Sequence, residues 1–139
     1  ITGLGKYFEK KSPTTEMILA DPKGSIVKDT VEKNKVNTAD YSWLVEGIGE
    51  DFIPDTLDIK YIKKAYEVSN NEAFDTIREL ALNEGILAGS SSGTLISAAL
   101  KYCKEQEKTK NVVTFVCDNG EKYLNTAYNK LWLKEKNLI

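Results

Sequence analysis

Gly85-Ile-Leu-Ala-Gly-Ser-Ser-Ser-Gly-Thr94 is the stretch of sequence on which the predicted fold depends. It joins a short apolar run at 86–88 to an alanine-rich, helix-forming run at 94–104, through a turn of glycines and serines. Backbone N–H groups at a helix start are unpaired and lie at the positive end of the helix dipole, so they attract polar or anionic ligands. Serine hydroxyls add groups that both donate and accept hydrogen bonds.

This pattern leaves two interpretations open, a small-molecule site or a capped strand-to-helix turn without a ligand. It is not a nucleotide-binding P-loop, because no Lys follows Gly93. The glycine spacing also differs from the dinucleotide-binding motif.

Before and after this stretch, short apolar runs alternate with amphipathic runs. Strands are predicted at 17–20, 59–68, 86–88 and 112–117, and helices at 2–11, 72–83, 94–104 and 123–136. We expect Asn70 or Asn71 to cap the second helix and Gly85 to end it in the left-handed conformation. Residues 23–37 are predicted as a loop with a short turn of helix, 46–54 as a tight loop, and 41–45 as extended. Continuous apolar strands that alternate with helices predict an α/β fold with three layers, a mostly parallel sheet covered by helices on both faces.

Composition excludes several functions. The 139 residues carry a net charge of −2 with both signs interspersed, which does not favour a nucleic-acid or membrane partner. The absence of histidine removes Ser-His and Cys-His catalysis, and we expect no metal site. Cys103 and Cys117 are predicted to be reduced and buried, in a cytoplasmic protein. The chain opens on Ile1 and its single Met is Met17, so we expect it to be part of a longer protein.

Four stretches together resemble one family, and they span essentially the whole chain: Thr2-Gly-Leu-Gly-Lys-Tyr7, Glu46-Gly-Ile-Gly-Glu-Asp-Phe-Ile-Pro54, Gly85–Thr94 and Asp118-Asn-Gly-Glu-Lys-Tyr123. Their order and spacing are similar to the C-terminal half of the pyridoxal-phosphate β-synthases, cystathionine β-synthase and cysteine synthase (O-acetylserine sulfhydrylase). The resemblance implies the tryptophan-synthase-β-like fold, known as fold type II. It implies pyridoxal 5′-phosphate as cofactor, small amino-acid substrates and a homodimer.

The resemblance also implies roles for particular residues. The Ser91 hydroxyl is expected to meet the pyridine nitrogen of the cofactor, Gly47 and Gly49 to form a loop on its substrate side, and Asp118 to lie near the ring end of the site. Serine at a helix start offers a neutral hydrogen bond and disfavours a protonated pyridinium. With an unprotonated ring nitrogen the cofactor withdraws electrons less strongly, which suits loss of a β-substituent followed by addition of a nucleophile.

The resemblance implies as well that this chain holds no catalytic residue. The Schiff-base Lys and the phosphate loop belong to the N-terminal part, upstream of Ile1, so we expect these 139 residues alone to be inactive. Asp21-Pro-Lys-Gly-Ser-Ile26 and Val45-Glu46 favour cystathionine β-synthase, whereas Glu50 stands where Tyr is common in that enzyme. Cysteine synthase therefore remains an alternative, as do a non-catalytic interaction domain and an unrelated nucleotide-binding domain.

Overall fold

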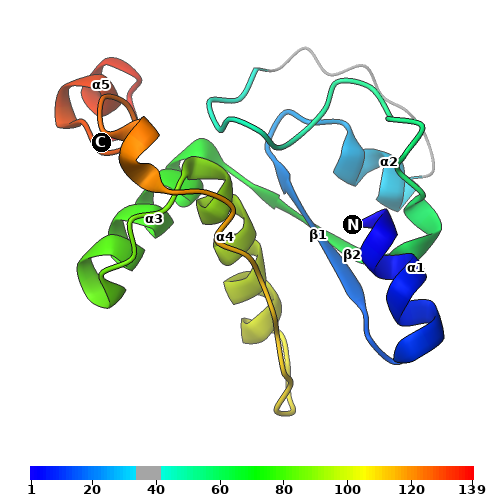
Figure 1. Cartoon of the computed structure of the whole chain (residues 1–139). Helices are drawn as coiled ribbons and strands as arrows, with labels where there is room; N and C mark the ends of the chain where they lie inside the picture. Colours follow the sequence, from blue (N-terminus) through cyan, green and yellow to red (C-terminus); the bar gives the residue numbers. More distant parts are fainter. Residues whose placement is uncertain (34–41) are drawn as a thin grey trace. The chain divides into compact units, whose positions relative to one another are not determined.

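The computed structural model describes residues 1–33 and 42–139, and its elements are shown in Figure 1. The chain divides into two compact units, one made of Ile1–Trp43 and Gly49–Glu67, the other of Leu44–Ile48 and Val68–Ile139. The predicted α/β class is confirmed, with helices and a strand pair in the described residues. No helix in this part of the chain is long and apolar enough to cross a membrane.

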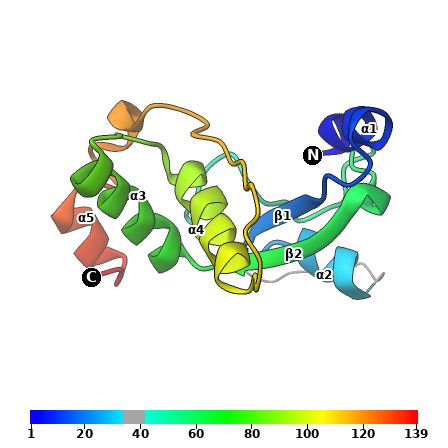
Figure 2. The same ribbon diagram turned by 90° about the horizontal axis from the view of Figure 1, so that it is seen from below.

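The first unit is built on a pair of neighbouring strands. Its elements are α1 (Thr2–Lys11), β1 (Met17–Pro22), α2 (Val27–Lys33), the 3-10 turn η1 (Ile59–Tyr61) and β2 (Ile62–Val68), whose last residue belongs to the second unit. β1 and β2 pair directly, which Figure 2 also shows. At 23–37, predicted as a loop with a short turn of helix, the structure forms α2 over seven residues, and residues 34–37 lie outside the described residues.

A side chain from the strand explains why α2 forms. Asp21 is buried, and its Oδ2 accepts a hydrogen bond from the Lys28 backbone N–H at 2.8 Å, in the first turn of α2. Carboxylates at a helix start satisfy unpaired N–H groups, but here the carboxylate comes from β1 and no local sequence pattern indicates it. Burial raises the pKa of Asp21, and the Lys28 hydrogen bond opposes that rise.

The second unit consists of helices and one 3-10 turn, among its described elements. It contains α3 (Asn70–Glu84), α4 (Ser90–Lys104), the 3-10 turn η2 (Gly120–Tyr123) and α5 (Lys130–Glu135). α3 and α4 lie side by side in Figures 1 and 2. Gly93 makes this contact close, because a Cβ at that position would collide with the Ala73 carbonyl oxygen. Across the same interface the Thr76 and Ser97 hydroxyls are 2.7 Å apart.

Helix boundaries differ from the predicted ones for local reasons. Ser69, rather than Asn70 or Asn71, caps α3 in a reciprocal capping box with Glu72. Gly85 ends α3 at φ 69°, in the predicted left-handed conformation. α4 begins at Ser90 instead of Thr94, which places all three serines in its first turn.

Two predicted strands are not formed in the described residues. Residues 86–88 make only an isolated antiparallel bridge, between Ala88 and Asn119. Residues 112–117 have no strand partner and are exposed, Val113 to 85 %. Cys103 and Cys117 are exposed as well, so their predicted burial was wrong. The predicted helix at 123–136 is reduced to α5, which η2 and a turn precede.

Candidate functional site

The start of α4 brings together Ser91 and Asp118, two predicted site residues of the second unit. Gly89 is its N-cap, with no side-chain cap hydrogen bond, and Ser90, Ser91 and Ser92 follow as buried residues of the first turn. The helix therefore presents N–H groups and hydroxyls together, at the positive end of its dipole. This arrangement can hold a neutral or anionic acceptor.

Ser90 and Ser92 each accept a hydrogen bond from the backbone of another segment. The Ser90 Oγ accepts a hydrogen bond from the Glu46 backbone N–H at 3.4 Å, which ties the start of α4 to the loop at 44–48. The Ser92 Oγ accepts one from the Cys117 backbone N–H at 2.9 Å, which ties it to the segment at 112–117. Each hydroxyl thus satisfies a backbone donor that has no strand partner.

The middle hydroxyl is different. Ser91 is only 8 % exposed, and among the described residues its hydroxyl makes no hydrogen bond. The Ser91 Oγ is not among the fully buried atoms that lack a partner, so solvent or a ligand can reach this hydroxyl. The role of Ser91 toward a cofactor stays a prediction.

Asp118 and Thr94 add two more polar atoms without partners. Asp118 Oδ1 and Thr94 Oγ1 are buried and have no hydrogen-bond partner in the described residues. Thr94 follows Ser91 by three residues on α4, so both side chains lie on one side of that helix. Asp118 Oδ1 lies directly against Gly89, where any Cβ would collide with it.

The segment at 118–123 is fixed to the residues before α4. The Gly89 N–H donates to the Asp118 carbonyl at 3.1 Å, and the Gly120 N–H donates to the Leu87 carbonyl at 3.0 Å. Tyr128 reinforces this bridge, because its hydroxyl donates to the Ala88 carbonyl at 2.7 Å and accepts from the Ala88 N–H at 3.2 Å. Asp118 is therefore held beside the N-cap of α4.

Tyr123 is the site residue that sequence reasoning missed. Its hydroxyl donates to Asp118 Oδ2 at 2.8 Å, and its ring lies against Gly89. Burial, together with the Asp118 hydrogen bond and charge, raises the pKa of Tyr123 to about 12. The spacing of Asp118 and Tyr123 in the sequence carries no signal for this contact, since it depends on η2.

The two predicted loop glycines fall in different units. Gly47 belongs to the second unit at φ 74°, with open space where a side chain would begin. Gly49 belongs to the first unit at φ 85° and packs against Pro22 and Trp43. Both conformations favour glycine, which explains the Gly-Ile-Gly pattern locally. Their role on the substrate side of a cofactor stays a prediction.

Glu50 is held by its backbone in the first unit. Its N–H donates to the Ser25 Oγ at 3.0 Å, and its carbonyl accepts from the Ile26 N–H at 3.0 Å and from the Ser25 hydroxyl at 3.1 Å. Two stretches that bear on the choice of activity, 21–26 and 46–54, thus meet through these bonds. The position of residue 50 is set by Ser25.

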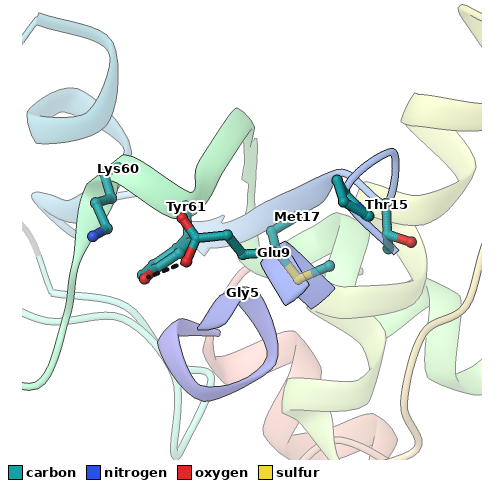
Figure 3. A pocket seen from close by; sticks show the side chains of 7 residues that line it. Gly5, Glu9, Thr15, Met17, Lys60 and Tyr61 are labelled. Carbon is teal, nitrogen blue, oxygen red and sulfur yellow. Dashed lines mark hydrogen bonds between the residues drawn. The ribbon is translucent and has the colours of Figure 1, made fainter. Parts of the chain in front are cut away.

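A separate cavity of about 200 Å³ lies in the first unit and is shown in Figure 3. Its lining includes Gly5, Glu9, Met17, Lys60 and Tyr61. The charged groups there already have partners, since the Tyr61 hydroxyl donates to Glu9 at 3.4 Å and Lys60 pairs with Asp58 at 3.5 Å. The described residues contain no group of three or more Asp, Glu or Cys side chains placed to bind a metal ion.

Comparison with known proteins shows the family of this chain. The family model described as "Pyridoxal-phosphate dependent enzyme" matches residues 1–118. Cystathionine beta-synthase of Saccharomyces cerevisiae is 38 % identical over 99 % of this chain and 27 % of its own length. Cysteine synthase of Staphylococcus aureus is 37 % identical over 91 % of this chain and 38 % of its own length. The chain thus spans between a quarter and two fifths of these curated relatives.

Solved structures show the same fold. An O-acetylserine-dependent cystathionine beta-synthase from Helicobacter pylori superposes with a TM-score of 0.74 at 31 % identity, over 90 % of this chain and 38 % of its own. O-ureido-L-serine synthase superposes with a TM-score of 0.77 at 25 % identity, over 89 % of this chain and 37 % of its own. These neighbours are fold-type II enzymes, which confirms the predicted fold class. With its motifs, its fold and most of its length in agreement, the chain belongs to the family of pyridoxal-phosphate-dependent enzymes.

Proposed function

We propose that the intact protein is a pyridoxal-phosphate-dependent β-replacement enzyme, and that this chain is the C-terminal part of its catalytic domain. The observation that carries the proposal is the Ser91 hydroxyl, which makes no hydrogen bond among the described residues although the residue is only 8 % exposed. Membership of a cofactor-dependent family supports it. Ser91 donates its hydroxyl hydrogen to the pyridine nitrogen of the cofactor.

The residues at the start of α4 fit this cofactor. A serine hydroxyl is a neutral donor, and it suits an unprotonated ring nitrogen. The cofactor, when bound, supplies an electron sink that lets the β-substituent of an amino acid leave. With Ser91 as the partner, no carboxylate favours protonation of the ring nitrogen, so the cofactor withdraws electrons only moderately. Asp118, which is fixed beside Gly89, would lie near the ring end of the cofactor.

The exposed apolar segments support the proposal that the rest of the domain comes from residues outside this chain. Val112, Val113, Phe115 and Val116 are all more than a third exposed, and so are Ile86 and Leu87. Their sequences are typical of buried parallel strands. In the intact protein we expect both segments to pair with further strands of one sheet, and the Schiff-base Lys and the phosphate loop to come from the same additional part.

For the substrates, we propose serine and homocysteine, which give cystathionine. The alternative is O-acetylserine and sulfide, which give cysteine. Two observations support this alternative. Glu50 stands where Tyr is common in cystathionine β-synthase, and the chain matches a cystathionine beta-synthase and a cysteine synthase at similar identity. A homodimer and a cytoplasmic location stay predictions.

The test is an assay of the intact protein with both substrate pairs after loading with pyridoxal 5′-phosphate. Preference for serine plus homocysteine supports the proposal, and preference for O-acetylserine plus sulfide reverses the order of the two activities. If the intact protein does not bind the cofactor, both proposed activities are ruled out. The 139 residues expressed alone are expected to show neither turnover nor stable cofactor absorbance.

A further inference from the structure

We propose that Tyr123 is a positioning residue, which holds the Asp118 carboxylate against Gly89 and thereby fixes the turn of α4 that carries Ser91. The inference rests on the proposed contact of Ser91 with the cofactor, and it adds a residue for which no role was predicted. Tyr123 itself touches neither substrate nor cofactor. It acts through Asp118 and Gly89.

The contacts form a short chain from one residue to the next. The Tyr123 hydroxyl donates to Asp118 Oδ2 at 2.8 Å. The other oxygen, Oδ1, lies against Gly89, and the Gly89 N–H donates to the Asp118 carbonyl at 3.1 Å. Gly89 is the N-cap of α4, two residues before Ser91. A rotation of the Asp118 side chain would therefore displace Gly89 at the start of α4.

Tyr123 provides the one side-chain hydrogen bond that the Asp118 carboxylate makes among the described residues. Oδ1 is buried without a partner, so loss of the phenol would leave both oxygens without one. A charged group without hydrogen bonds moves toward solvent or draws water in. Burial and Asp118 raise the pKa of Tyr123 to about 12, so the phenol remains a donor into the alkaline range.

Gly89 explains why the carboxylate can come so close. The N-cap has φ −74° and ψ 165°, a conformation open to any residue, so backbone freedom does not require glycine here. A Cβ would instead collide with Asp118 Oδ1 and come within 2.7 Å of the Tyr123 ring. Gly89, Asp118 and Tyr123 thus form one packed unit at the start of α4, which we call the N-cap brace.

The chain offers a matched control in Tyr128. Its hydroxyl also bonds to the segment before α4, at the Ala88 carbonyl and N–H, but that hydroxyl makes no hydrogen bond to the N-cap brace in the described residues. The Tyr128 backbone N–H donates to the Tyr123 carbonyl at 3.2 Å, a bond that Tyr128→Phe leaves in place. Tyr128→Phe makes the same chemical change as Tyr123→Phe. A purely structural effect of losing a phenol at this place would appear in both variants.

The experiment is a double-mutant cycle in the intact protein, between Tyr123→Phe and Ser91→Ala. The readouts are cofactor affinity by fluorescence titration and the absorption maximum of the bound cofactor, and urea unfolding confirms that each variant folds. Tyr123→Phe is expected to weaken cofactor binding by about fivefold and to shift the absorption maximum. In the Ser91→Ala background the same change is expected to have an effect below about twofold, because nothing remains to be positioned.

Additive effects of Tyr123→Phe and Ser91→Ala would overturn the inference, and so would an unchanged cofactor spectrum in Tyr123→Phe. Equal coupling of Tyr128→Phe to Ser91→Ala would overturn it too. If Ser91→Ala alone leaves affinity and spectrum unchanged, the proposed function fails instead. Should Tyr123→Phe not fold, Asp118→Asn takes its place, because a neutral amide oxygen accepts more weakly and the same coupling is expected.

Discussion

The Ser92 hydroxyl accepts a hydrogen bond from the Cys117 backbone N–H at 2.9 Å, and so joins the first turn of α4 to a segment without strand partners. Ser92 is fully buried, whereas Cys117 is exposed. The bond assigns Ser92 to the scaffold and separates it from its neighbour Ser91. Three serines in a row are therefore not equivalent.

Ser92→Ala is expected to destabilise the protein by about 0.5–1.5 kcal/mol, the net value of a hydrogen bond, since the exposed Cys117 exchanges its acceptor for water. The free energy of unfolding of the intact protein, from urea titration, measures this. Ser42→Ala, at an exposed position, is the control and is expected to stay within about 0.5 kcal/mol. Equal values for the two variants would contradict the assignment of Ser92 to the scaffold.

Ser91→Asp should leave the fold intact and change the chemistry. A carboxylate at this place favours a protonated ring nitrogen, so we expect a shifted cofactor absorbance and turnover reduced by about tenfold or more. Steady-state kinetics and the absorption spectrum of the intact protein test both effects. Unchanged kinetics with unchanged absorbance would show that residue 91 does not face the cofactor.

Gly89→Ala is expected to cost about 1–3 kcal/mol, because the new methyl group collides with Asp118 Oδ1 in the N-cap brace. Gly3→Ala is the matched control, since no atom lies within 4 Å of the Cβ position there and alanine favours the helix α1. Thermal or urea unfolding of the intact protein compares them. A neutral Gly89→Ala would mean that Asp118 does not occupy the place described.

Alkaline pH offers a test of the Tyr123 environment. A phenol whose pKa is raised to about 12 in the folded protein stabilises it fully below the ordinary value of 10. This contribution is lost as pH rises from 10 to 12, because the unfolded chain releases the proton first. Tyr123→Phe should therefore lose less stability than the wild type over this interval. Identical pH profiles of the unfolding free energy for the two proteins would contradict the buried hydrogen bond.

Much of the second unit could be predicted from local sequence. The left-handed Gly85 and the apolar positions of α3 follow from helix periodicity and C-cap chemistry. The Gly/Ser turn marks a helix start, whereas the role of Ser91 within it was implied by the family resemblance and stays a prediction. The start of α4 was placed four residues late, since glycine and serine disfavour helix interiors but are suited to first turns.

The features that could not be predicted depend on partners distant along the chain. α2 begins where Asp21 of β1 caps it, and Tyr123 matters because η2 brings it to Asp118. Residues 112–117 have the composition of a strand, yet a strand needs a neighbour, and the described residues supply none. The exposed Cys117 follows from the same missing neighbour.

The central claim is that the Ser91 hydroxyl donates to the ring nitrogen of the cofactor. The most direct measurement is the ¹⁵N chemical shift of pyridoxal phosphate labelled at that nitrogen, bound to the intact protein, with Ser91→Ala and Ser92→Ala compared. We predict an unprotonated, hydrogen-bonded nitrogen in the wild type and in Ser92→Ala, and a clear change in Ser91→Ala. A shift that is the same in all three proteins, or one that reports a protonated nitrogen in the wild type, would contradict the claim.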